Sequence, residues 1–194
     1  MADDHREPSL QPQLKIDIQS EEPVWTPARR ELWRRIEQHD FESDTPLNFT
    51  GRLARDHGWS FEDARAAVEA YRRFCFLAVV SPTPVTPSEI VDEVWHQHLI
   101  YSRDYWTIWC GETLRLPLHH DPTPGGPEAQ MTYRRQYAET LALHERAFGP
   151  PSLELWPATH LRLGRPRYHM TDSSRWLIMP RPIAWIRRLF RKMK

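Results

Sequence analysis

Three helix-start signals divide this chain and constrain its fold more than any other feature. Thr26-Pro27 combines a hydroxyl suited to capping with a proline in the first helical turn. Ser60 to Asp63 has the form of a capping box with Asp in place of Glu, and Thr86-Pro87-Ser88-Glu89 is a complete one with Thr86 as the cap. Because residues with helical spacing follow these signals, we predict an all-α fold.

The spacing of apolar residues and the breakers between them predict the helix boundaries. After Ser60, apolar residues recur at steps of three and four: Phe61, Ala64, Val68, Tyr71, Cys75 and Ala78. We expect five helices. The first runs from Thr26 to about residue 39, the second is short and ends near Gly58, and the third runs from residue 61 to the prolines at 82 and 84. The fourth runs from Thr86 to Cys110, where Gly111 is the stop, and the fifth covers residues 128–148 and is ended by Gly149.

These elements predict a compact bundle of four to five helices within residues 25–158. Residues 1–24 are polar and interrupted by prolines, so we expect disorder there apart from a short strand at 14–18. Residues 159–174 are predicted to be a linker, and 175–194 a basic amphipathic helix. The chain has 194 residues, which allows one such domain with tails.

Composition excludes several classes of protein. Only seven glycines occur beside 18 prolines, without a glycine-rich phosphate loop, so no small-molecule cofactor is evident. The net charge is zero, so we expect no nucleic-acid binding. Two cysteines cannot form a disulfide scaffold, and no leader or membrane-spanning run is seen. We therefore expect a cytoplasmic protein.

Histidines gather in one stretch, since four of the ten lie between residues 96 and 120. On a helix His96 and His98 point about 200° apart, so one ion cannot bind both. Asp92 and His96 share a face, and a loop can return His119 and His120 to it. We predict one divalent metal ion, zinc or iron. Its ligands would be His96 and His120, with Asp92 or His119 as the third; hydrogen bonding without a metal is the alternative.

A second set of side chains in this stretch is predicted to be structural. His98 falls in line with tryptophans and tyrosines at helical steps, which is typical of a buried, hydrogen-bonded histidine. Cys110 lies 14 positions after His96, about 21 Å along a straight helix, so we expect a small buried residue and not a ligand. The predicted structural polar cluster contains Trp95, His98, Tyr105 and Cys110.

The chain resembles a known family in two stretches. One is VDEVWHQHL, residues 91–99, followed by a tyrosine, a cysteine and a histidine near an acid; the other is TYRRQYAETLALHERAFGPP, residues 132–151. These resemble the glycine-rich domain-containing protein-like family over residues 50–157, in a bacterial-type form without the glycine-rich segment. The resemblance implies an important role for the WHxH cluster but no settled activity. The family pattern falls on Asp92, Trp95, His96, His98, Tyr105, Cys110 and His120.

Charge is concentrated at the end of the chain. Residues 175–194 hold seven basic residues and no acidic one, which leaves 19 basic against 26 acidic residues, a net charge of −7, in residues 1–174. On a helix, apolar and basic residues of 183–194 separate onto two faces, as in a helix lying in a membrane interface. We predict attachment to an anionic membrane surface or a protein partner, with docking on the chain's own domain as the alternative. The residues concerned are Trp185, Arg187, Arg188, Phe190, Arg191 and Lys192.

Two functions remain open. The first is a cytoplasmic accessory or interaction module of unknown activity, whose WHxH cluster is structural or metal-loaded and whose tail attaches to a membrane or partner. The second is a metalloenzyme in which His96 and His120, with Asp92 or His119, hold an ion that activates water or dioxygen. No general base is evident beside the candidate ligands, which favours the first function.

Overall fold

Seven helices make up the part of the chain that the computed structural model describes, residues 14–16, 23–42, 45–122 and 124–162. The predicted all-α fold is confirmed, because these residues contain no strand. The elements in chain order are α1 (Pro27–Gln38), α2 (Phe49–His57), α3 (Phe61–Val80), α4 (Glu89–Ile100), the π-helix η2 (Asp104–Leu114), α5 (Gly126–Phe148) and α6 (Thr159–Arg162).

Local capping contacts begin and end the first three helices. The Thr26 hydroxyl accepts a hydrogen bond from the backbone N–H of Arg29 at 3.3 Å, and the Ser60 hydroxyl accepts one from that of Asp63 at 3.0 Å. Gly58 ends α2 with a φ of +64°, a conformation that glycine adopts without steric cost. These contacts satisfy backbone groups at the helix ends, and they confirm the predicted boundaries at Thr26, Gly58 and Ser60.

The helix after the third start signal begins later than predicted. Ser88, and not Thr86, caps α4, because its hydroxyl accepts from the backbone N–H of Val91 at 3.2 Å. Thr86 contacts α5 instead: its backbone N–H donates to the Thr140 hydroxyl at 3.0 Å. The segment before α4 is therefore tied to α5.

The predicted single helix up to Cys110 is interrupted at Tyr101, where α4 ends. The chain continues as η2, in which backbone hydrogen bonds join residues five apart. Asp104, the first residue of η2, accepts hydrogen bonds from His39 and His98. This contact across the core holds the chain in its new direction.

The end of η2 also differs from the prediction. Gly111 lies inside the π-helix, so the predicted stop there is wrong. The chain leaves the helix at Arg115, which has a φ of +58° and whose backbone N–H donates to the Cys110 carbonyl. Because the backbone bonds of η2 continue through Gly111, the absence of a side chain there does not terminate it.

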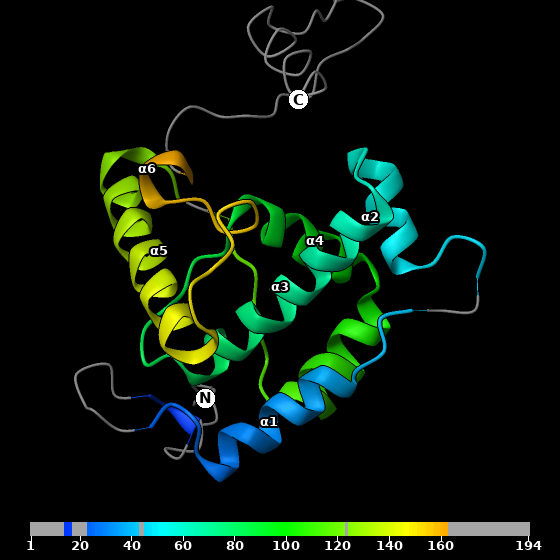
Figure 1. The fold of residues 1–194 in the computed structure, drawn as a ribbon, viewed down its shortest axis with the longest axis horizontal. Coiled ribbons are helices and arrows are strands. Elements are labelled where there is room, and N and C mark those ends of the chain that lie inside the picture. Colours follow the sequence, from blue (N-terminus) through cyan, green and yellow to red (C-terminus); the bar gives the residue numbers. More distant parts are fainter. Residues whose placement is uncertain (1–13, 17–22, 43–44, 123, 163–194) are drawn as a thin grey trace, which may run out of the picture. The chain divides into compact units, whose positions relative to one another are not determined.

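Helix α3 lies at the centre of the bundle and contacts α1, α2, α4, α5 and η2 (Figure 1). Twelve of its 20 residues are buried, so it is covered on most of its circumference. The predicted core residues Val68, Tyr71 and Cys75 are among them, whereas Phe61, the first residue of the helix, is exposed. The other helices are arranged around this central element.

Both ends of the chain are described only in part. Near the N-terminus, in the stretch predicted to be a short strand, Ile16 is buried and its backbone N–H donates to the Val80 carbonyl at 2.8 Å. Residues 14–16, the described part of the predicted strand, do not form one. Helix α6 falls within the predicted linker, and the predicted tail 175–194 lies outside the described residues.

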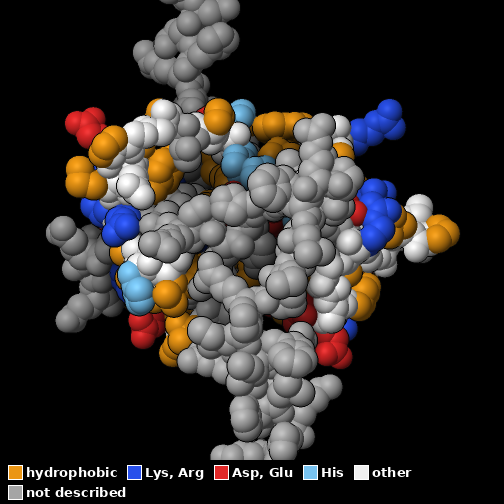
Figure 2. Space-filling view, turned by 90° about the horizontal axis from the view of Figure 1, so that it is seen from above, with side chains coloured by type: hydrophobic (Ala, Val, Ile, Leu, Met, Phe, Trp, Pro, Cys, Tyr) orange, Lys and Arg blue, Asp and Glu red, His pale blue; other side chains and the backbone are white. Residues whose placement is uncertain are grey.

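Neither a membrane-spanning helix nor a patch of one charge stands out among the described residues on the face drawn in Figure 2. None of the described helices has the length and apolar character needed to cross a membrane. On the face drawn in Figure 2, acidic and basic side chains of the described residues are scattered among hydrophobic ones, and a few histidines lie together. The grouped histidines are therefore the candidate functional residues.

Candidate metal centre

Asp92, His96 and His120 lie together on one side of α4, and we call them the open cluster. Each offers a ligand atom, and these atoms all lie within 4.8 Å of one another. His120 Nε2 is 2.8 Å from Asp92 Oδ1, and the ring centroids of His96 and His120 are 4.5 Å apart. The fold thus brings together an aspartate and a histidine of α4 with a histidine from the loop after η2.

The shortest of these separations, between Asp92 and His120, is close to that of two ligands around one metal ion. Two ligand atoms that each lie about 2.1 Å from an ion are about 3.0 Å apart at a right angle and about 3.4 Å apart at a tetrahedral angle. The contact between Asp92 and His120 is slightly shorter than this, as expected of a hydrogen bond. Small side-chain rotations would therefore allow an ion to replace the shared proton.

The beginning of α4 determines where Asp92 and His96 point. They are four residues apart, so they project from one face of the helix, one turn from each other. The Ser88 cap fixes where the helix begins. The Asp92 side chain is 27% exposed and His96 is exposed, so the cluster is accessible from solvent.

Trp95 and Tyr105 hold the loop that carries His120. Trp95 Nε1 donates to the Tyr105 hydroxyl at 2.8 Å, and this hydroxyl donates to the carbonyl of Leu118, two residues before His120. The Trp95 ring also packs against the His120 imidazole, with 4.3 Å between their centroids. Two members of the predicted structural polar cluster therefore position a candidate metal ligand.

Both cysteines are buried and belong to neither of the two groups of candidate metal ligands. Burial raises the pKa of the Cys110 thiol, although hydrogen bonds with the Leu118 backbone and with Tyr105 act in the opposite direction. Burial also raises the pKa of Cys75, in the core. The thiols therefore stay protonated at neutral pH, which agrees with the structural role predicted for them.

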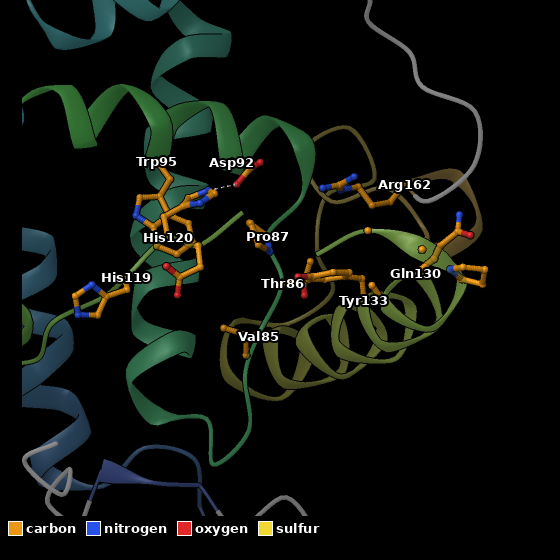
Figure 3. A pocket seen from close by; sticks show the side chains of 15 residues that line it. Val85, Thr86, Pro87, Asp92, Trp95, His119, His120, Gln130, Tyr133 and Arg162 are labelled. Carbon is orange, nitrogen blue, oxygen red and sulfur yellow. Dashed lines mark hydrogen bonds and ion pairs between the residues drawn. The ribbon is translucent and has the colours of Figure 1, made fainter. Parts of the chain in front are cut away.

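His119, the alternative third ligand, does not join the open cluster. Its side chain is exposed and packs against Trp106, with 5.4 Å between the ring centroids. It points away from Asp92, to which the neighbouring His120 is bonded (Figure 3). Of the two candidates for the third ligand, the geometry therefore selects Asp92.

The open cluster borders a cleft of about 770 Å³, a volume typical of small-molecule sites (Figure 3). Asp92 and His120 line this cleft, while His96 lies outside its lining, so an ion bound by all three would sit at the rim. Arg162 and the first turn of α5 contribute to its other end. Apolar and aromatic residues form much of the wall: Val85, Pro87, Trp95, Pro127, Ala129 and Tyr133.

His39, His98 and Asp104 form a second group, which we call the buried cluster. Asp104 Oδ2 lies 2.7 Å from His98 Nε2 and 3.1 Å from His39 Nε2. On the other side of the His98 ring, Nδ1 lies 3.0 Å from the Tyr71 hydroxyl. Both ring nitrogens of His98 therefore have protein partners.

The electrostatics of the buried cluster are those of a neutral imidazole hydrogen-bonded to an ionised carboxylate. Burial lowers the pKa of His98, so its imidazole is neutral at neutral pH and donates from Nε2 to Asp104. Burial alone would raise the pKa of Asp104, but hydrogen bonds from His39 and His98 outweigh it and lower that pKa well below its ordinary value. A neutral imidazole between a carboxylate and a hydroxyl fits the structural role predicted for His98.

Sequence reasoning missed several residues of these sites, among them His39 and its partner Asp104. His39 caps the end of α1, 65 residues before its partner Asp104, and no local pattern identifies it. Arg162 falls in the predicted linker. Tyr133 is half-buried on the cleft wall. Their positions depend on contacts between distant elements, so spacing alone gives no signal for them.

No family model, curated protein or solved structure matches the chain. The resemblance to the glycine-rich domain-containing protein-like family therefore stays a prediction.

Proposed function

We propose that this protein binds one divalent transition-metal ion at the open cluster. The observation that supports it is the approach of three ligand atoms, from Asp92, His96 and His120, to within 4.8 Å of one another. Two imidazoles and one carboxylate suit zinc or iron(II), whereas magnesium and calcium prefer oxygen ligands. Zinc and iron are therefore the metals we expect.

We further propose that the bound ion is catalytic. Structural zinc sites commonly have four protein ligands, whereas catalytic sites leave a coordination position open. In the open cluster three ligands lie at the rim of a cleft large enough for a small molecule. The ion would activate water or dioxygen there. Asp121 and His119 also line the cleft and are the titratable side chains nearest to His120 in the chain.

A second proposal is an accessory module in which the metal only stabilises the fold. It is favoured by the hydrogen bonds of Trp95, His98 and Tyr105, which all go to protein groups. It also agrees with membership of the glycine-rich domain-containing protein-like family, which implies no settled activity. In this case the ion would tie the His120 loop to α4 without taking part in a reaction.

Elemental analysis of protein purified without a histidine tag tests the metal site. Wild-type protein loaded with Zn²⁺, or anaerobically with Fe²⁺, and then desalted should hold about one ion per chain. His96→Ala should lose the ion and keep its fold, because His96 is exposed. The matched control is His119→Ala, which removes an exposed histidine outside the cluster and should leave the metal content unchanged.

Two results would contradict this site: a wild-type protein that never retains an ion, or equal metal loss from His96→Ala and His119→Ala. Once binding is established, comparison of metal-loaded and metal-free protein separates the two functions. A metal-dependent hydrolysis or oxygen-consuming reaction supports the enzyme. A metal that raises only the free energy of unfolding supports the accessory module.

For the tail we propose reversible attachment to an anionic membrane surface. The support comes from the sequence, where basic residues that include Arg187, Arg188, Arg191 and Lys192 share one helical face and Trp185 lies at its edge. Each basic residue contributes about 1 kcal/mol near an anionic leaflet. Sedimentation with anionic liposomes should pellet the full chain at low salt but not a chain ending at residue 174. Pelleting that is absent or insensitive to salt contradicts this proposal and leaves a protein partner or docking on the chain's own domain.

We place this protein in the cytoplasm. Both cysteines are unpaired, as expected in a reducing compartment. Fractionation of cells that express the chain with a small C-terminal tag should recover it in the cytosol and, if the tail binds membranes, in a salt-extractable membrane fraction. Recovery outside the cell contradicts this location.

A further inference from the structure

The two ends of the cleft differ in chemistry. The end beside the open cluster carries Asp92 and His120, and Asp121 follows directly in the chain. The other end carries Arg162 of α6 and the first turn of α5, and aromatic and apolar side chains lie between them (Figure 3). A molecule lying along the cleft would therefore meet acids and imidazoles at one end and a guanidinium at the other.

Arg162 is held in place by one acidic partner, but one of its N–H donors has no acceptor among the described residues. Its Nη1 lies 3.3 Å from Glu89 Oε1, and its side chain is 17% exposed. Its Nε is buried and has no hydrogen-bond partner among the described residues. A guanidinium has five N–H donors, and a buried donor without an acceptor is unfavourable. A small rotation of this group would bring the unpaired N–H to an acceptor in the cleft.

The adjacent end of α5 adds to the same positive field. Gly125 precedes the helix without a side-chain cap, and both Gly125 and Gly126 line the cleft with positive φ angles of 78° and 89°. The first backbone N–H groups of a helix and its dipole favour a negatively charged group nearby. Pro127 has no N–H and Glu128 is acidic, so this end of the helix adds only weakly to the charge of Arg162, which is the main anion-binding group.

We propose that the cleft binds a small organic anion with two functional ends. A carboxylate pairs with Arg162, a second oxygen-bearing group coordinates the metal ion, and an apolar body lies between them against Trp95 and Tyr133. This inference rests on the metal site proposed above, because the second group needs an ion to bind. It names the class of substrate that the site would take.

The arrangement also sets the direction in which such a molecule binds. Glu89 contacts one side of the guanidinium, which orients it as a planar group suited to a bidentate carboxylate. At the end beside the open cluster, the negative charge of Asp121 repels a carboxylate unless a bound metal ion offsets that charge. The carboxylate farther from the reacting group is therefore expected at Arg162.

Titration calorimetry of the zinc-loaded protein tests this proposal with a matched set of probes. Glutarate, adipate and pimelate carry two carboxylates, whereas pentanoate, hexanoate and heptanoate have the same chain lengths and only one. At least one diacid should bind the wild type about tenfold more tightly than its matched monoacid. Arg162→Gln should remove this difference without changing the zinc content. The control is Arg135→Gln, an exposed arginine of α5 outside the cleft lining, which should keep it.

Equal binding of diacids and monoacids by the wild type overturns the proposal, and so does an Arg162→Gln protein that keeps the diacid preference. Should Arg162→Gln unfold, Arg162→Lys retains the charge but not the planar donors, and a diminished preference supports the proposal while an unchanged one overturns it. If the wild type retains no zinc, the proposed metal site fails separately. In that case, pentanoate binding that is weaker in Arg162→Gln than in the wild type still supports carboxylate binding at Arg162. Equal binding of pentanoate by the two proteins overturns it.

Discussion

The open cluster and the buried cluster each contain two histidines and one aspartate, and each has one histidine on α4. They differ in solvent exposure and in their hydrogen-bond partners. In the open cluster, His96 is exposed, and the Asp92 and His120 side chains are 27% and 19% exposed at the rim of a cleft. In the buried cluster, His98 is fully buried and both of its ring nitrogens have protein partners. His96 and His98 are therefore two positions apart in the chain, but one is exposed to solvent and the other is buried.

The difference shows that residue type does not by itself define a metal site. A ligand atom must present a lone pair to a space that an ion can enter. In the buried cluster, the Tyr71 hydroxyl faces one ring nitrogen of His98, and the carboxylate that an ion would need already accepts from two imidazoles. In the open cluster, one hydrogen bond between Asp92 and His120 is all that an ion would replace.

The largest expected effect contrasts the two histidines of α4 directly. His98→Ala should lower the free energy of unfolding by about 3–5 kcal/mol, because it leaves a cavity and removes the partners of Tyr71 and Asp104. His96→Ala should change it by about 0.5 kcal/mol or less, since the side chain is exposed. Urea denaturation followed by circular dichroism measures both values. Similar losses in the two variants would remove the distinction between the clusters.

An intermediate effect is expected where the structural residues support the open cluster. Tyr105→Phe removes the acceptor of Trp95 and the donor to the Leu118 carbonyl, which should cost about 1–3 kcal/mol of unfolding free energy. Because the His120 loop is then less fixed, zinc affinity should fall about 10- to 100-fold. Competition with a chelating dye measures this affinity. Tyr133→Phe, on the cleft wall, is the control, and an unchanged affinity in Tyr105→Phe would show that the loop is held by other contacts.

The smallest expected effect is on the pH dependence of stability. Burial lowers the folded-state pKa of His98, while the unfolded chain has a value of about 6.5. The unfolded state therefore takes up a proton first, so the contribution of His98 is complete above about pH 6.5 and is lost as the pH falls toward its folded value. Asp104 acts in a lower window: its pKa is lowered in the fold, so its contribution is complete above about pH 4 and is lost below it.

Urea unfolding at a series of pH values from 7 to 5 tests this dependence. Stability should decrease as the pH falls in the wild type, and the slope should be shallower in His98→Gln. Part of the slope should persist, because burial also lowers the pKa of His144. Identical slopes in the two proteins would mean that His98 is not held neutral by its surroundings.

The helix starts at Thr26 and Ser60 were predictable because their signals are local, and the break in the middle of the chain was not. Thr26 and Ser60 cap helices with backbone groups three residues away, so nearby sequence contains the whole interaction. The end of α4 at Tyr101 is different. Asp104 is bonded to His39, 65 residues away, and only the folded core brings these residues together. Helical spacing therefore predicted a straight helix across a position where tertiary contacts redirect the chain.

The candidate site shows the same division. The pairing of Asp92 with His96 follows from four-residue spacing on a helix and needs no tertiary information. The choice between His119 and His120 depends on packing, because the Trp95 ring lies against His120 while Trp106 lies against His119. Arg162 reaches the cleft from the other end of the described chain. Residues that meet only through the bundle leave no periodic pattern in the sequence.

The π-helix has a consequence for how chains with this fold can diverge. Its buried residues, which include Tyr105, Trp109, Cys110 and Leu114, lie four and five positions apart, in keeping with its wide turn. Loss of one exposed residue such as Thr107, with the bonding between residues five apart kept, would rotate every later side chain by nearly a quarter of a turn. We therefore expect substitutions on the outer face to be tolerated better than insertions or deletions between residues 104 and 114. The number of residues in this segment constrains the fold more than the identity of its exposed side chains.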